Sequence, residues 1–223
     1  MRKYLFFLTF LVCFCVHSQE YQLGFLPTVN WNKKLPKEFA FNLKIQSREE
    51  LKRGEFSTYQ PVNFKHQLID IETLFSKKIS FKSKLLLGYM IRFKDGDLLH
   101  RILQQWIVKH SFSSVTFAHR LATDQTMGNS VSFQFRLRYR FTAVIPLNGQ
   151  IVDAKEFYLK NSTESLLSFS DGKQNFDQRL IPFIGYEFND RQKLEFGLNY
   201  LVRAQSERIN NTFWIGINWY QKL

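Results

Sequence analysis

The segment from Val131 to Ile145 alternates apolar and polar side chains with a period of two. Every odd position is apolar or aromatic, and the even positions include Arg136, Arg138 and Arg140. This period places the two kinds of side chain on opposite faces of a β-strand. The segment is much longer than the ~5–6 residues usual for a strand, and a tilted strand crosses a membrane in about 9–11 residues. The pattern therefore predicts a barrel strand with its aromatic face toward lipid and its arginines inside.

The composition favours strands over membrane helices. Hydrophobic residues make up 44% of the chain, yet the mean hydropathy is −0.27 because apolar and polar residues are interleaved. A transmembrane helix needs about 20 consecutive apolar residues. A chain of 223 residues is long enough for one barrel domain.

The N-terminus has the features of a secretory signal peptide. Arg2 and Lys3 precede an apolar run, residues 4–16, which ends shortly before Ser18. This order predicts a signal peptide over residues 1–18 and a barrel domain over residues 19–223; an uncleaved anchor helix is the alternative, although the run is short for that. Cys13 and Cys15 are the two cysteines of the chain. The mature chain would then have neither disulfides nor cysteine-based metal sites.

The formal net charge of +12 raises the question of a polyanionic partner. Nucleic acid is one candidate, but the basic residues are dispersed along alternating segments, and export would separate the protein from nucleic acid. Attraction to anionic lipid headgroups explains the charge more simply. The expected partners are outer-membrane lipid and lipopolysaccharide, the barrel-assembly machinery and a small anionic solute.

The same alternation recurs in ten further segments. They are residues 23–31, 39–48, 69–75, 85–93, 100–110, 115–121, 151–160, 180–188, 194–203 and 213–219. Residues 49–61, 124–129 and 161–175 are expected to be loops, the last being the longest. Short turns and longer loops tend to alternate, as in an up-and-down barrel.

The predicted fold is all-β: a transmembrane up-and-down antiparallel β-barrel of about 10–12 strands. An odd strand count is unexpected, because single-chain bacterial barrels have an even number. Either the first segment, which Pro27 interrupts, is not a full strand, or another strand lies near Thr163–Phe169.

Several short motifs occur together in one order. They are His100-Arg101-Ile102, Gln104-Gln105, His119-Arg120, Arg136-Leu137-Arg138-Tyr139-Arg140, Pro146-Leu147-Asn148-Gly149, Glu156-Phe157, Gln178-Arg179 and Gly185-Tyr186. In these motifs the chain resembles a family of Bacteroidetes-type outer-membrane β-barrels of unknown function, over essentially all of the mature chain. The resemblance implies an outer-membrane location and no particular reaction. The resemblance also implies a role for the last strand. Its C-terminal residues Trp219, Tyr220 and Leu223 are similar to the C-terminal signal that outer-membrane barrels present for insertion.

Charged residues on the predicted inner faces form the candidate site. They are Arg101, Arg120, Arg136, Arg138, Arg140, Glu156, Arg179, Glu187, Glu195 and Arg203, together with Asp70 and Glu72 on the segment 69–75. One interpretation is a structural ladder of ion pairs that fills the lumen, because unpaired buried charge is costly. The other is a narrow conduit that prefers anions, because arginine binds carboxylate and phosphate with its planar fork.

Two other functions are compatible with the residues. A lipid hydrolase or acyltransferase would need a serine within hydrogen-bond reach of a histidine; the candidates are His66, His100, His110, His119, Ser111, Ser113 and Ser114. A soluble lipocalin-like barrel would instead gather its aromatic residues inside. The sequence has no cluster with metal-ligand spacing and no phosphate-binding glycine loop, so we expect no metal and no cofactor.

Overall fold

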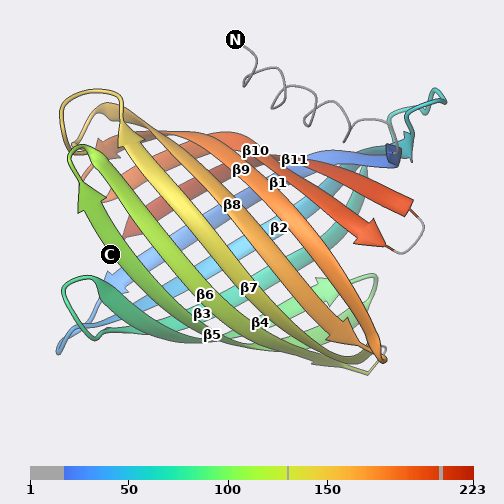
Figure 1. Cartoon of the computed structure of the whole chain (residues 1–223), viewed down its shortest axis with the longest axis horizontal. Helices are drawn as coiled ribbons and strands as arrows, with labels where there is room; N and C mark the ends of the chain where they lie inside the picture. Colours follow the sequence, from blue (N-terminus) through green and yellow to red (C-terminus); the bar gives the residue numbers. More distant parts are fainter. Residues whose placement is uncertain (1–17, 130, 206–207) are drawn as a thin grey trace, which may run out of the picture.

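The computed structural model describes residues 18–129, 131–205 and 208–223, which form one closed β-barrel (Figure 1). Its strands are β1 (Ser18–Lys34), β2 (Phe39–Glu55), β3 (Lys65–Lys78), β4 (Ser83–Lys94), β5 (Asp97–Phe112), β6 (Val115–Gly128), β7 (Val131–Pro146), β8 (Glu156–Ser170), β9 (Lys173–Asn189), β10 (Gln192–Gln205) and β11 (Arg208–Lys222). No helix among these residues is long and apolar enough to span a membrane. The predicted signal peptide, apart from Ser18, lies outside the described residues. The all-β barrel class is confirmed.

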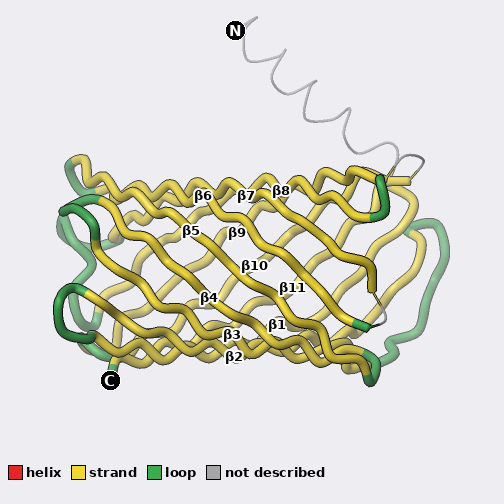
Figure 2. The backbone as a smooth tube through the Cα atoms, turned by 90° about the horizontal axis from the view of Figure 1, so that it is seen from below, coloured by secondary structure: helices red, strands yellow, loops and turns green. Residues whose placement is uncertain are grey.

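A parallel seam closes the barrel. β1 pairs with β11 in parallel, from Ser18 opposite Ile209 to Asn32 opposite Lys222, whereas the other neighbouring strands are antiparallel. The segment with Pro27 is a full strand, so the first explanation for an odd count was wrong. Residues Thr163–Phe169 are strand, as the second explanation expected, but they belong to β8 and add no further strand to the described sheet. With eleven strands in the closed sheet, β1 begins and β11 ends at opposite ends of the barrel (Figure 2).

The largest error in the predicted strands concerns β8. Residues 161–175 were expected to form the longest loop, but β8 runs through Ser170 and begins at Glu156 rather than at residue 151. The reason is that the outward positions Asn161, Thr163 and Ser165 are polar, so the apolar alternation that marks the other strands fails in the middle of this one. The predicted loops at 49–61 and 124–129 are also partly strand, because β2 extends to Glu55 and β6 to Gly128.

The connections do not separate into a short-turn end and a long-loop end. The two longest, residues 56–64 and 147–155, follow β2 and β7. Successive connections in this barrel alternate between its ends, so these two lie at opposite ends (Figure 2). The predicted alternation of short turns and long loops was therefore wrong.

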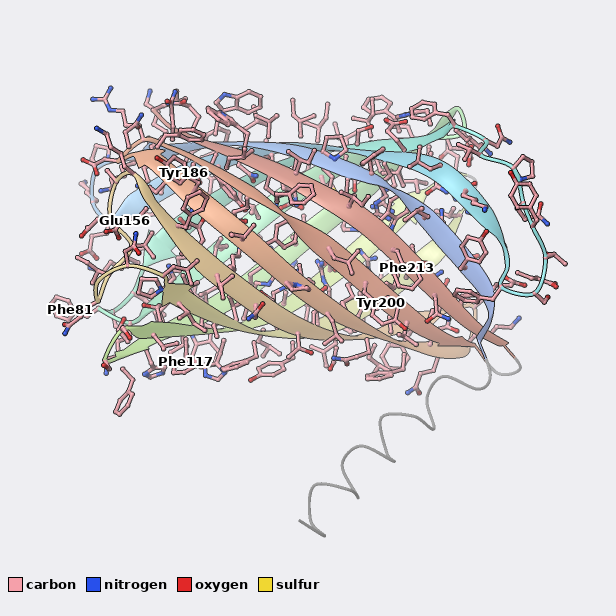
Figure 3. All side chains as sticks on the ribbon, turned by 90° about the horizontal axis from the view of Figure 1, so that it is seen from above. Phe81, Phe117, Glu156, Tyr186, Tyr200 and Phe213 are labelled. Carbon is pink, nitrogen blue, oxygen red and sulfur yellow. The ribbon has the colours of Figure 1, made fainter. Side chains whose placement is uncertain are left out.

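The two faces of the wall differ sharply in chemistry. On β7 the side chains of Arg136 and Arg138 are 13% and 14% exposed, whereas Phe133 and Tyr139 on the alternate positions are 57% and 45% exposed. Aromatic side chains such as Phe117 project from the outside of the wall (Figure 3). The apolar face therefore points outward and the charged face points into the lumen.

Glycines on the inner face make room for bulky side chains of the neighbouring strand. A Cβ atom at Gly197 would lie 2.2 Å from the carbonyl oxygen of Pro182 and 2.7 Å from the Cα atom of Phe183. Since both are backbone atoms, no side-chain rotation relieves the clash. At Gly54 the nearest atom belongs to the side chain of Gln60, which can move.

Gly197→Val is therefore expected to destabilise the barrel by about 1–3 kcal/mol or more, as overpacking does. Gly54→Ala is the control and should leave the urea midpoint of the refolded protein nearly unchanged. Equal midpoints for the wild type and Gly197→Val would show that the register between β9 and β10 is wrong.

Candidate functional site

The lumen encloses a cavity of about 490 Å³ to which all eleven strands contribute side chains. Eight strands make a barrel that side chains just fill, so eleven leave additional space. The basic residues that line it are Lys44, Arg48, Arg92, Arg101, Arg120, Arg136, Arg138, Arg140, Lys160, Arg179 and Arg203. The acidic residues are Asp70, Glu72 and Asp177, which line the cavity, and the buried Asp124, Glu164 and Glu195, which pair with lining residues.

Asp124 on β6 is the first of two carboxylates that each hold three arginines. It is fully buried. Arg136 Nε donates to its Oδ1 atom at 2.6 Å, Arg138 Nη2 lies 2.7 Å from Oδ2, and Arg101 Nε lies 3.4 Å from Oδ1. Thr126 accepts a hydrogen bond from the same Arg101 Nε at 2.8 Å. This cluster joins three neighbouring strands and carries two more positive charges than negative ones.

Glu164 on β8 is the second such carboxylate, and it too has no exposed surface. Arg120 Nη2 and Arg140 Nε lie 2.6 and 2.9 Å from Oε2. Arg179 Nη1 lies 3.1 Å from Oε1. The three arginines come from β6, β7 and β9, so Glu164 links four consecutive strands. This cluster also has an excess of two positive charges.

The remaining carboxylates have single cationic partners. Arg92 forms a bidentate ion pair with Asp70: its Nε donates to Oδ1 at 2.6 Å and its Nη2 donates to Oδ2 at 2.7 Å. Lys44 Nζ is 3.0 Å from Glu72, and Arg203 Nε is 3.2 Å from Asp177.

Glu195 accepts hydrogen bonds from a lysine and two phenols. Lys160 Nζ lies 3.0 and 2.8 Å from its two oxygens. The hydroxyls of Tyr158 and Tyr220 each donate to it at 2.9 Å. Its negative charge is thus fully compensated within the lumen.

The lumen therefore has a cationic excess. Among the residues that the structure describes, eleven basic groups face six carboxylates. All six carboxylates are paired, so the excess resides in the arginines and lysines. Charges within such a narrow space are poorly screened, so they attract anions and repel cations more strongly than exposed charges would.

Most of the predicted site residues gather at this cavity. Arg101, Arg120, Arg136, Arg138, Arg140, Arg179 and Arg203 line it, and Glu195 lies buried against Lys160. Glu156 and Glu187 are opposite each other in the register between β8 and β9, at the end of the barrel where Glu156 is visible in Figure 3. Glu156 accepts from the backbone N–H of Asp153 at 3.2 Å.

Sequence reasoning missed the two central carboxylates, because Asp124 and Glu164 fell in predicted loops. A signal for Asp124 was present: it shares the parity of Arg120 on the same strand. No comparable signal marks Glu164, because the outward face of β8 is polar at its centre. Arg48 is the last residue of the predicted strand segment 39–48 and is not among the predicted site residues.

The histidines do not form a catalytic pair with a serine among the described residues. His119 Nδ1 lies 2.8 Å from the Tyr139 hydroxyl, and His66 Nδ1 lies 2.9 Å from Glu49. Ser111 shares a hydrogen bond with Thr116. Nor does the described part of the chain contain a group of three or more His, Cys, Asp and Glu side chains suited to a metal ion.

Comparison with known proteins gives one match. The model of a family described as "Protein of unknown function (DUF2490)" matches residues 23–213, which include all the basic and acidic residues of the cavity described above. Neither a curated protein nor a solved structure matches the chain. Since the match covers most of the barrel, the chain belongs to the DUF2490 family.

Proposed function

We propose that this protein is an outer-membrane β-barrel whose lumen is a narrow conduit for small anions. The proposed location is supported by the apolar outer face, which a closed barrel can present to lipid because its backbone groups are paired between strands. The predicted signal peptide supports export. The proposed partners are therefore outer-membrane lipid, lipopolysaccharide and the machinery that assembles barrels.

The observation that carries the proposed conduit is the cationic excess of the cavity. A lumen filled only for stability would be expected to balance its charges, because each unpaired buried charge is costly. Here Asp124 and Glu164 each hold three arginines. Rings of arginine and lysine are what anion-selective pores use to attract anions and repel cations.

The proposal predicts anion selectivity in planar lipid bilayers. Under a potassium chloride gradient, the purified protein should give discrete conductance steps. The sign of the reversal potential should show that chloride is more permeant than potassium. Gln134→Glu adds a carboxylate to the cavity lining and should move the reversal potential toward zero. Gln150→Glu makes the same charge change on the exposed connection after β7 and should not. Absence of current, or cation selectivity, would contradict the conduit.

A further inference from the structure

Arg48 on β2 differs from every other arginine of the lumen. The other eight each have a carboxylate within 4.0 Å. Arg48 has no ion pair with any residue that the structure describes, and its buried Nε atom has no hydrogen-bond partner. Arg48 is one of the residues that line the cavity. A cation of this kind costs stability unless something else supplies the missing negative charge.

The surroundings of Arg48 add further positive charge. Arg92, Arg136 and Arg179 line the same cavity as Arg48, and their positive charges act on it. They extend from β4, β7 and β9, so the four guanidinium groups reach the cavity from different parts of the wall. The negative charge of Asp70 also acts on Arg48, but both oxygens of Asp70 already accept hydrogen bonds from Arg92. The negative charges of Asp124 and Glu164 are likewise shared among three arginines each.

We propose that Arg48, together with Arg92, Arg136 and Arg179, forms a binding site for the phosphate group of a small molecule. A phosphate monoester carries a charge of about −1.5 to −2 near neutral pH and three acceptor oxygens. That charge matches the local excess better than a single carboxylate does. Guanidinium groups that approach from several directions can each donate to a different oxygen.

The size of the cavity favours a phosphate ester over inorganic phosphate alone. Its volume of about 490 Å³ lies within the range of about 300–1,000 Å³ of pockets that hold small organic ligands. The polar side chains of Asn175 and Asn199 also line it, so the rest of the ligand can be polar, as a sugar is. This inference deepens the proposed conduit by naming the class of ligand that binds in it. It rests on the proposed function in one respect: the ligand must be able to enter the lumen from the surrounding solution.

The test measures ligand binding in detergent micelles without any current. The thermal unfolding midpoint and calorimetric titration are recorded with inorganic phosphate, glucose 6-phosphate, sulfate and glucose. Wild-type protein should be stabilised by both phosphate compounds, more by glucose 6-phosphate if the whole cavity is used, and not by glucose. Equal effects of phosphate and sulfate would assign the site to any divalent oxyanion and overturn its phosphate specificity.

Arg48→Gln is the decisive variant. No carboxylate loses its partner in this change, so the barrel should fold, with an unliganded unfolding midpoint equal to or above that of the wild type. Its phosphate affinity should fall about tenfold or more, as expected for one lost charge-assisted contact. Arg191→Gln, at an exposed turn, is the matched control and should bind as the wild type does.

The outcomes separate this inference from the proposed conduit. If wild-type protein is not stabilised by either phosphate compound, or if Arg48→Gln responds as the wild type does, the phosphate site is wrong, whether or not chloride passes. If the phosphate compounds bind and Arg48→Gln weakens them, but no chloride current appears, the site stands and the conduit fails.

Discussion

Replacing Glu164 with glutamine is expected to destabilise the barrel by roughly 3–5 kcal/mol, the usual cost of removing one partner from a buried ion pair. Glu164 has no exposed surface, and it compensates the charges of Arg120, Arg140 and Arg179. Glutamine keeps the shape of the side chain but not its charge, so each of the three guanidinium groups would lose the carboxylate with which it forms an ion pair in the described part of the chain. Urea unfolding of the refolded protein in lipid vesicles measures the loss.

Asp190→Asn removes one negative charge from an exposed turn and serves as the control, with an expected change within about 0.5 kcal/mol. Adding Arg140→Met to Glu164→Gln should recover part of the lost stability, because it removes one of the unpaired cations. If Glu164→Gln unfolds at the same urea concentration as Asp190→Asn, the cluster around Glu164 does not hold the lumen together.

Leu137→Arg is expected to cost about 2–4 kcal/mol in a membrane, as arginine does on the lipid face near the bilayer midplane. Leu137 lies on the outer face of β7 between Arg136 and Arg138 and is 38% exposed. In a water-soluble barrel the same change at an exposed position would cost little. Unfolding in lipid vesicles therefore distinguishes the two environments.

Gln150→Arg introduces the same side chain on an exposed connection and controls for added charge. Both variants should assemble, but only Leu137→Arg should unfold at a lower urea concentration. Equal stability of the two variants would contradict the assignment of this face to lipid.

Much of the wall could be predicted from local alternation. The segment chosen from sequence, Val131–Ile145, matches β7 almost to the residue. Alternation is informative because one face of each strand is apolar and the other is charged. The sequence of a single strand is therefore enough to predict which of its residues face the lumen. Where the outer face turns polar, as at Asn161, Thr163 and Ser165, the signal disappears, and the strand that carries Glu164 was predicted as a loop.

Other features depend on contacts between distant parts of the chain. The parallel pairing of β1 with β11 joins the two ends of the barrel, and neither strand alone indicates the direction of its partner. The same holds for Arg48: its sequence neighbours place it on the inner face, but its lack of a carboxylate partner is a property of the assembled lumen. Sequence therefore predicts which residues face inward, and the structure is needed to say which of their charges remain uncompensated.

Quenching of tryptophan fluorescence by brominated lipids tests the sidedness of the wall most directly. Trp106 lies on the outer face and is 47% exposed, whereas Trp214 is 5% exposed and lines the lumen. Two variants, each keeping one of these tryptophans and replacing the other three with phenylalanine, would be refolded into vesicles. We predict strong quenching of Trp106 and little quenching of Trp214. Little quenching of Trp106, in a protein that stays folded and monodisperse without detergent or lipid, would contradict the account.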